Sequence, residues 1–257
     1  MKNRIYFYTG TGNSLRAAKI IADKNQDCEL IAITEKAEKK IPKGYERIGF
    51  VFPVYFQGLP KIVADFISNA DFSEQQDTYF FAVATYGALH GNAIPQVGKL
   101  LKEQGIYLDY GHNLRMFSNY VVMYNMSKKV AKVTAQSERK TIPIAQNIVN
   151  KQENHIPPFN KLVNWYYQKQ MRHVPDADLN FSVSDDCSSC GMCEAVCASK
   201  NIVMKDGQPI FQHHCNQCMG CIQYCPKRAI NYKKITQRRR RYTHPQISFK
   251  ELTQYYQ

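Results

Sequence analysis

Eight of the nine cysteines lie in two similar stretches, one beginning at Cys187 and the other at Cys215. Each stretch has three cysteines at two-residue spacing and a fourth one four positions further on, so the second stretch repeats the first at a constant offset. Three thiolates at this spacing can hold three corners of an iron-sulfur cubane, while the fourth reaches the other cluster. The pattern therefore predicts two [4Fe-4S] clusters with crossed ligands. The first cysteine set is Cys187, Cys190, Cys193 and Cys225, and the second cysteine set is Cys215, Cys218, Cys221 and Cys197.

Cysteines also bind zinc and form disulfides, and each of these alternatives has its own requirement. Four-cysteine zinc sites usually pair their ligands two by two, whereas a triplet plus one is repeated here. Disulfides need an oxidising compartment, and the residues around Met1–Tyr6 have no long apolar stretch of the kind that export signals carry. We therefore expect clusters in a cytoplasmic protein, with zinc as the less favoured alternative.

The composition indicates a two-part chain with an excess of positive charge. Its 257 residues are 44% hydrophobic, and no apolar run is long enough to span a membrane. There are 34 Lys and Arg against 21 Asp and Glu, which gives a formal net charge of +13. Eight of the basic residues lie between Lys227 and Arg241. They could form a solvated surface or attract an acidic redox partner. A nucleic-acid partner is not favoured, because little else in the chain suggests a groove-reading element.

A second kind of chemistry is indicated near the N-terminus. The apolar run Arg4–Tyr8 is followed by a turn of glycines and hydroxyl side chains, Thr9–Ser14, and then by apolar residues at helical spacing. A strand, such a turn and a helix start together present amide and hydroxyl donors to a phosphate. The turn is neither a Walker loop nor a complete dinucleotide fingerprint.

Later strands end in similar loops. Strands are expected at Cys28–Ile33, Arg47–Phe52 and Thr78–Ala84, and a fifth run spans Ile106–Tyr124. Helices are expected over Lys61–Asn69 and from the loop after Thr78–Ala84 to about Gly105. Because ligands bind at the carboxyl ends of the strands in an open α/β sheet, the loops after these strands should lie together with the turn.

These motifs resemble two known families. The Thr9–Ser14 turn and the aromatic loops after the third and fourth strands resemble flavodoxin, with a doubly wound five-stranded parallel sheet that binds FMN. The cysteine stretches resemble the bacterial two-cluster ferredoxin, a small α+β domain whose motif ends in Cys-Pro. Cys225 is followed by Pro226, but Cys197 is followed by Ala198, which puts that loop in question. The resemblance implies FMN contacts from Thr9, Gly10, Thr11, Gly12, Asn13, Ser14, Pro53, Val54, Tyr55, Phe56, Thr85, Tyr86 and Gly87.

The whole chain is similar to flavodoxin-ferredoxin fusion proteins of anaerobic bacteria. The expected parts are a flavodoxin-like domain (1–155), a helical connector (156–177), a ferredoxin-like domain (178–235) and a basic tail (236–257). Residues from about Ser127 to His173 are expected to be helical, with a break at Pro157–Pro158, and to pack the two domains together, with Trp165 in or near the junction. The alternative is a helix that only completes the flavodoxin-like core. Arg241–Pro245 shows no recognisable chemistry.

The expected function is transfer of electrons between two [4Fe-4S] clusters and FMN, linking a low-potential donor to a redox partner. The FMN loops 53–61 and 85–98 contain no Asp or Glu. A flavin there should accept its second electron at a less negative potential than in acidic flavodoxins, so electrons should run from the clusters to FMN. Two alternatives are a flavoenzyme that reduces a small molecule at the FMN, although no dedicated substrate site is recognisable, and a zinc-binding nucleic-acid module. The oligomeric state is left open.

Overall fold

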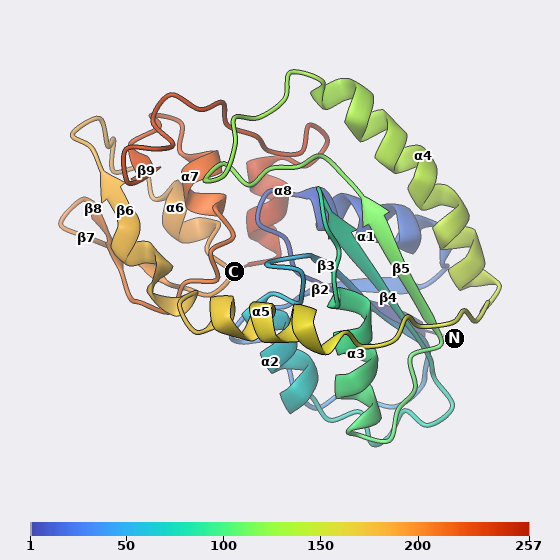
Figure 1. The fold of residues 1–257 in the computed structure, drawn as a ribbon. Helices are drawn as coiled ribbons and strands as arrows, with labels where there is room; N and C mark the ends of the chain where they lie inside the picture. Colours follow the sequence, from blue (N-terminus) through green and yellow to red (C-terminus); the bar gives the residue numbers. More distant parts are fainter. Residues whose placement is uncertain (1, 257) are drawn as a thin grey trace.

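The computed structural model describes residues 2–256 and contains a five-stranded parallel sheet (Figure 1). The strands lie in the order β2-β1-β3-β4-β5. This is the strand order of flavodoxin-like doubly wound sheets, so the predicted fold class is confirmed. The strands are β1 (Lys2–Phe7), β2 (Cys28–Ala32), β3 (Tyr45–Pro53), β4 (Tyr79–Tyr86) and β5 (Tyr110–Arg115).

Helices cover both faces of this sheet, which is why the central strands are apolar throughout. In β3 the residues from Ile48 to Phe52 are all buried. From β1 the chain passes to β2 on one side, and it then adds β3, β4 and β5 one after another on the other side of β1. Because each crossover is right-handed, the helices of these two directions lie on opposite faces of the sheet. Thus α1 packs against α4 on one face, and α2 packs against α3 on the other. Their bounds are α1 (Asn13–Lys24), α2 (Lys61–Asn69), α3 (Ala93–Lys102) and α4 (Val130–Val149).

The C-terminal part repeats one small unit. Two antiparallel strand pairs, β6–β9 and β7–β8, flank two short helices. The helix α6 begins at Met192 and α7 begins at Gly220, and these two starts are separated by the same offset as Cys187 and Cys215. The elements are β6 (Phe181–Val183), α6 (Met192–Ala195), β7 (Ile202–Lys205), β8 (Gln208–Phe211), α7 (Gly220–Tyr224) and β9 (Ile230–Tyr232).

The two parts share one apolar core. Val196, Tyr224 and Leu252 of the C-terminal part belong to the same buried cluster as the strands of the sheet. The last helix, α8 (Phe249–Gln254), lies beside the sheet, and the Tyr256 hydroxyl donates a hydrogen bond to the Thr9 carbonyl. The positions of the domain boundaries along the sequence stay a prediction.

One expectation from the sequence was wrong. The fifth run, expected to reach Tyr124, forms a strand only over Tyr110–Arg115, because the chain then leaves the sheet edge and returns as a loop to α4. On α5 (Lys161–Met171), Trp165 is 63% exposed, so its ring is not buried between the two parts. Tyr167 of the same helix is buried, and its hydroxyl donates to the Leu59 carbonyl at 2.8 Å.

Among residues 2–256, no helix is both long enough and apolar enough to cross a bilayer.

Candidate functional site

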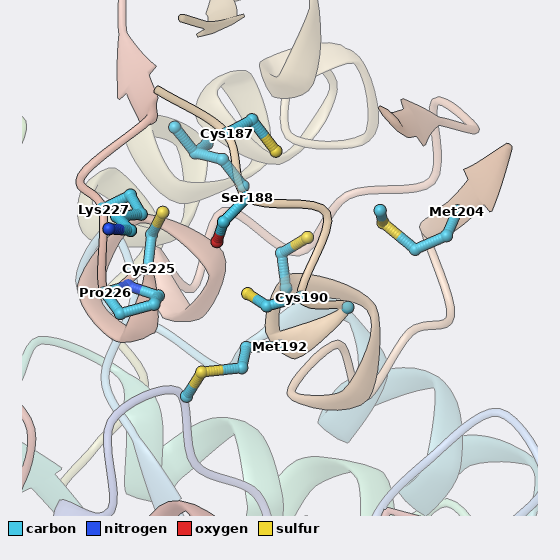
Figure 2. Close-up of a pocket in the computed structure, with 11 residues that line it drawn as sticks. Cys187, Ser188, Cys190, Met192, Met204, Cys225, Pro226 and Lys227 are labelled. Carbon is cyan, nitrogen blue, oxygen red and sulfur yellow. The ribbon is translucent and has the colours of Figure 1, made fainter. Parts of the chain in front are cut away.

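The first cysteine set surrounds one cavity (Figure 2). Cys187, Cys190 and Cys193 come from the loop into α6, and Cys225 comes from the end of α7, so the fourth thiol belongs to the other stretch. The pKa of the Cys193 thiol is raised to about 11, chiefly by burial, and the nearby thiols of Cys190 and Cys225 contribute smaller upward effects. Cys190 is exposed, so this set reaches the surface.

The second cysteine set lies deeper. Cys215 and Cys221 are buried. Burial raises the pKa of Cys218 to about 11, and Cys197 is the next cause of that rise. Cys197 also raises the pKa values of the buried Cys215 and Cys221 thiols. Cys197 is therefore close to the triplet of the second stretch, and Cys193 of the first set also raises the pKa of Cys221, so the two sets are neighbours. Crossed ligation stays a prediction.

The backbone repeats along with the cysteines. Positive φ angles recur at equivalent positions of the two stretches, at Ser189 (54°) and Gln217 (51°), and again at Lys200 (48°) and Arg228 (54°). Amides also donate to equivalent sulfurs, from Asn201 to Cys197 Sγ and from Ala229 to Cys225 Sγ, both at 3.2 Å. The loop after Cys197 therefore has the same shape as the loop that Pro226 begins, although Ala198 replaces the proline.

Among residues 2–256, no three Cys, His, Asp or Glu side chains are grouped as the ligands of a single metal ion would be.

The Thr9–Ser14 turn joins β1 to α1, and its donors are only partly used. Gly12 precedes the helix with φ 96°, and neither a side-chain cap nor an acidic residue satisfies the first turn of α1. The Gly12 amide donates to Thr9 Oγ1 at 3.0 Å, and the hydroxyls of Ser14 and Thr85 share a hydrogen bond of 2.9 Å. A buried helix N-terminus without a cap is a ready site for an anion. Amide and hydroxyl donors of this kind are the type that binds a phosphate group.

The second cysteine set packs directly on this turn. A Cβ added at Gly10 would lie 2.6 Å from the carbonyl oxygen of Cys218, which only a glycine avoids. In return, a Cβ added at Gly220 would lie 3.0 Å from the carbonyl oxygen of Gly10. The cysteine loop and the phosphate-type turn are therefore in van der Waals contact.

The aromatic side chains predicted to contact FMN do not all have neighbours in the same part of the molecule. Pro53 ends β3, and Thr85 and Tyr86 end β4, while Val54 joins the two strand ends through its amide, which donates to the Thr85 carbonyl at 2.9 Å. Tyr55 turns toward the second cysteine set, since burial raises the pKa of its hydroxyl strongly and Cys218 is the next cause.

Phe56 has a positive φ of 49°, and its ring lies 6.3 Å from that of Tyr120. Tyr86 points the other way, with its ring edge-on to His90 at 5.3 Å. Gly87 packs against Ser118, because an added Cβ would lie 2.2 Å from its Oγ.

The C-terminal segment contributes residues that the sequence did not indicate. The Tyr242 hydroxyl donates to Asn13 Oδ1 at 2.7 Å, and the His244 amide donates to the Thr11 carbonyl at 2.8 Å. His244 and Ile247 also lie against Gly12. Residues 242–247 thus cover the turn, although the sequence of Arg241–Pro245 shows no recognisable chemistry. In the sequence, the one sign of this contact was the presence of Tyr242, His244 and Ile247 among polar neighbours, and these residues match no known motif.

The arginines before this segment have structural partners. Arg239 donates to the Val121 carbonyl at 2.7 Å, and Arg240 donates to the Met126 carbonyl at 2.6 Å. Arg241 donates to Asn231 Oδ1 at 2.7 Å. The basic run therefore holds the loop after β5 in place, which a purely solvated tail would not do.

Comparison with known proteins gives limited matches. No protein-family profile matches the chain. Over 59 residues it is 34% identical to an uncharacterized polyferredoxin-like protein of Methanocaldococcus jannaschii. That match covers 23% of this chain and 26% of the other protein, so the chain spans about a quarter of this relative's length.

Among solved structures, oxidised flavodoxin 1 from Bacillus cereus is 17% identical, with a TM-score of 0.46 over 61% of this chain and 100% of that one. A putative flavoprotein from Bacteroides uniformis is 21% identical, with a TM-score of 0.37 over 44% of this chain and 90% of that one. Scores below 0.5 carry no argument by themselves, and the fold assignment rests on the order and direction of the strands.

Proposed function

We propose that this chain is an electron-transfer protein that holds two [4Fe-4S] clusters and FMN in one molecule. The observation that carries the proposal is the contact between Gly10 and Cys218, which brings the second cysteine set against the turn that fits a flavin phosphate. Iron-sulfur clusters exchange single electrons and flavins exchange one or two, and that is the chemistry these groups would supply when bound. The chain's own contribution is placement and burial.

The two cysteine sets would serve different ends of the route. Cys190 of the first set is exposed, so this set can meet a redox protein from outside. Cys215 and Cys221 of the second set are buried next to the turn, which shields that set from solvent and from other oxidants. We propose that electrons enter at the first set and leave from the flavin. A partner of acidic character suits a chain with a net charge of +13.

Reduction of a small molecule at the flavin is the second candidate function. It is favoured by one observation, because Tyr86 and Gly87 line cavities that open beside the predicted flavin loops. A pocket of several hundred Å³ at the carboxyl end of an α/β sheet is where substrates usually bind.

Metal and flavin analysis of the intact protein, purified without oxygen, tests the proposal. We expect about eight irons per chain, as two four-iron clusters require, together with one FMN. Zinc without iron, or an iron-loaded protein that binds no FMN at all, would overturn it. Rapid mixing with a strong one-electron reductant should then bleach the cluster absorption before the flavin absorption.

A further inference from the structure

The helix α4 and the edge strand β5 run side by side (Figure 1). Residues of both elements line two adjoining cavities. The upper cavity, of about 440 Å³, lies beside Gly87 and the loop that follows β5. The lower cavity, of about 340 Å³, lies along β5 itself and beside Tyr86. Both sizes fall in or near the range of small-molecule sites.

Successive turns of one face of α4 line both cavities. Val133, Gln136 and Ser137 line the upper one, and Pro143 and Ile144 line the lower one. Lys140, which lies between these groups on α4, lines both, and so does Arg115 at the end of β5. The two cavities therefore form one groove with two cations at its middle.

The charged side chains that line this groove are all positive. Neither cavity has an Asp or Glu in its lining. Within residues 2–256, neither Arg115 nor Lys140 forms an ion pair, although the nearby Arg16 and Glu138 pair with each other at 2.8 Å. An anion between the two cations would gain charge-assisted hydrogen bonds from both.

The two ends of the groove can each take a ring. The lower cavity offers Tyr110 and His112, whose rings are stacked at 6.3 Å, and the buried Oδ1 of Asn113, which has no hydrogen-bond partner among the described residues. The upper cavity offers Phe117 and Met116 with the amide of Gln136. An elongated ligand with its negative charge in the middle and a ring at each end matches this arrangement.

The geometry points to the groove between α4 and β5 as a binding site for a dinucleotide, with the diphosphate between Arg115 and Lys140 and one nucleoside in each cavity. The site is separate from the Thr9–Ser14 turn, because Phe117, stacked on Tyr242 at 4.3 Å, lies between them and accepts a hydrogen bond from Asn13. The ring in the upper cavity would lie beside Gly87. Its nearness to a flavin rests on the proposed function, but binding itself needs no flavin.

Equilibrium binding of NADH, NADPH and ADP to the intact protein tests this site. We expect saturable binding of a dinucleotide and a weaker interaction with ADP, which fills only half of the groove. Arg115→Gln and Lys140→Gln should each weaken dinucleotide binding about tenfold or more. The matched control Lys132→Gln also removes an α4 cation, but one that lines neither cavity, and it should bind as the unchanged protein does. Both cations are exposed, so the variants should fold.

Other outcomes would overturn the proposal. These are no saturable binding of any dinucleotide, binding that Arg115→Gln and Lys140→Gln leave unchanged, or inorganic phosphate binding as tightly as NADH. Competition by FMN would also overturn it, because the groove would then be the flavin pocket. Protein that binds NADH but lacks FMN would refute the proposed function and leave this site standing.

Discussion

Cys197 follows the first cysteine triplet in the chain, yet it raises the pKa values of the three thiols of the second one. The residue spacing predicts that it shares a cluster with them, since a fourth cysteine four positions beyond a triplet points away from its own loop. Gly10 is the other residue whose identity the packing explains, because the Cys218 carbonyl occupies the space where a side chain would begin.

Replacing Cys197 with serine should damage the cluster held by Cys215, Cys218 and Cys221 and spare the other one. The reason is that Cys197 is the predicted fourth ligand of that cluster, and it is close enough to those three thiols to raise their pKa values. Iron analysis should show about half of the iron lost, and cluster spectroscopy identifies which signal remains. Cys28→Ser is the control, since Cys28 lies on β2. Loss of the cluster of Cys187, Cys190 and Cys193 instead would contradict crossed ligation.

Gly10→Ala should destabilise the protein by about 1–3 kcal/mol, because the new methyl group would overlap the Cys218 carbonyl oxygen and force the two parts of the chain away from each other. Gly98→Ala on α3 is the matched control. Its added Cβ would meet nothing closer than 3.8 Å, and alanine should stabilise the helix by up to about 1 kcal/mol. Urea unfolding measures both. Equal stabilities of the two variants would mean that the contact does not hold the parts together.

At the scale of elements, the segment from Arg238 to Ile247 links the loop after β5, the Thr9–Ser14 turn and the C-terminal part. Burial lowers the pKa of His244 to about 4; a smaller effect of Glu138 raises it and a smaller effect of Arg16 lowers it. His244 is only 1% exposed, and its Nδ1 accepts a hydrogen bond from the Gln246 amide. The imidazole is therefore neutral in the folded protein at neutral pH.

This neutral histidine should make stability depend on pH. Below about pH 6.5 the unfolded chain binds a proton at His244 and the folded chain does not, so stability falls as the pH is lowered toward 4. The loss should reach up to about 3 kcal/mol at pH 4. Urea midpoints between pH 7.5 and 4.5 measure it. His244→Gln should flatten this dependence relative to the exposed control His155→Gln, and identical slopes would show that His244 is not responsible.

The arginines of the same segment should differ from one another in importance. Arg239→Gln and Arg240→Gln remove hydrogen bonds to carbonyls of the loop after β5, and each should cost about 1–2 kcal/mol. Arg238→Gln is the control, because Arg238 is exposed and should change stability by less than about 0.5 kcal/mol. Thermal unfolding compares the three variants. If all three lose stability equally, the separate hydrogen bonds are not the cause.

At the scale of the whole molecule, charge and packing affect the proposed flavin site together. The chain carries a net charge of +13, and its loops 53–61 and 85–98 contain no carboxylate. One unit charge several ångströms from a poorly solvated ring changes its energy by on the order of one to a few kcal/mol at an effective dielectric near 20.

We therefore expect the second one-electron reduction of the flavin to occur at a less negative potential than in acidic flavodoxins. The reason is that positive charges around the flavin stabilise the negative charge that this reduction adds. A redox titration of the intact protein, repeated at low and at high salt, measures the step, and added salt should remove only the part that exposed charges contribute. A step as negative as that of an acidic flavodoxin would refute the expectation and the proposed direction of electron flow.

The sequence alone determined the fold class, because it follows from local patterns, and the pairing of the cysteines stays a prediction from the same kind of pattern. Apolar runs such as Ile48–Phe52 form buried parallel strands, and cysteine spacing restricts which thiols one loop can bring together. Only the tertiary structure decided what meets the Thr9–Ser14 turn. Cys218, Tyr242 and His244 reach it from the opposite end of the chain. Such contacts depend on how two parts pack, and neither periodicity nor motif spacing carries that information. For the same reason the exposure of Trp165 and the groove between α4 and β5 were not foreseen.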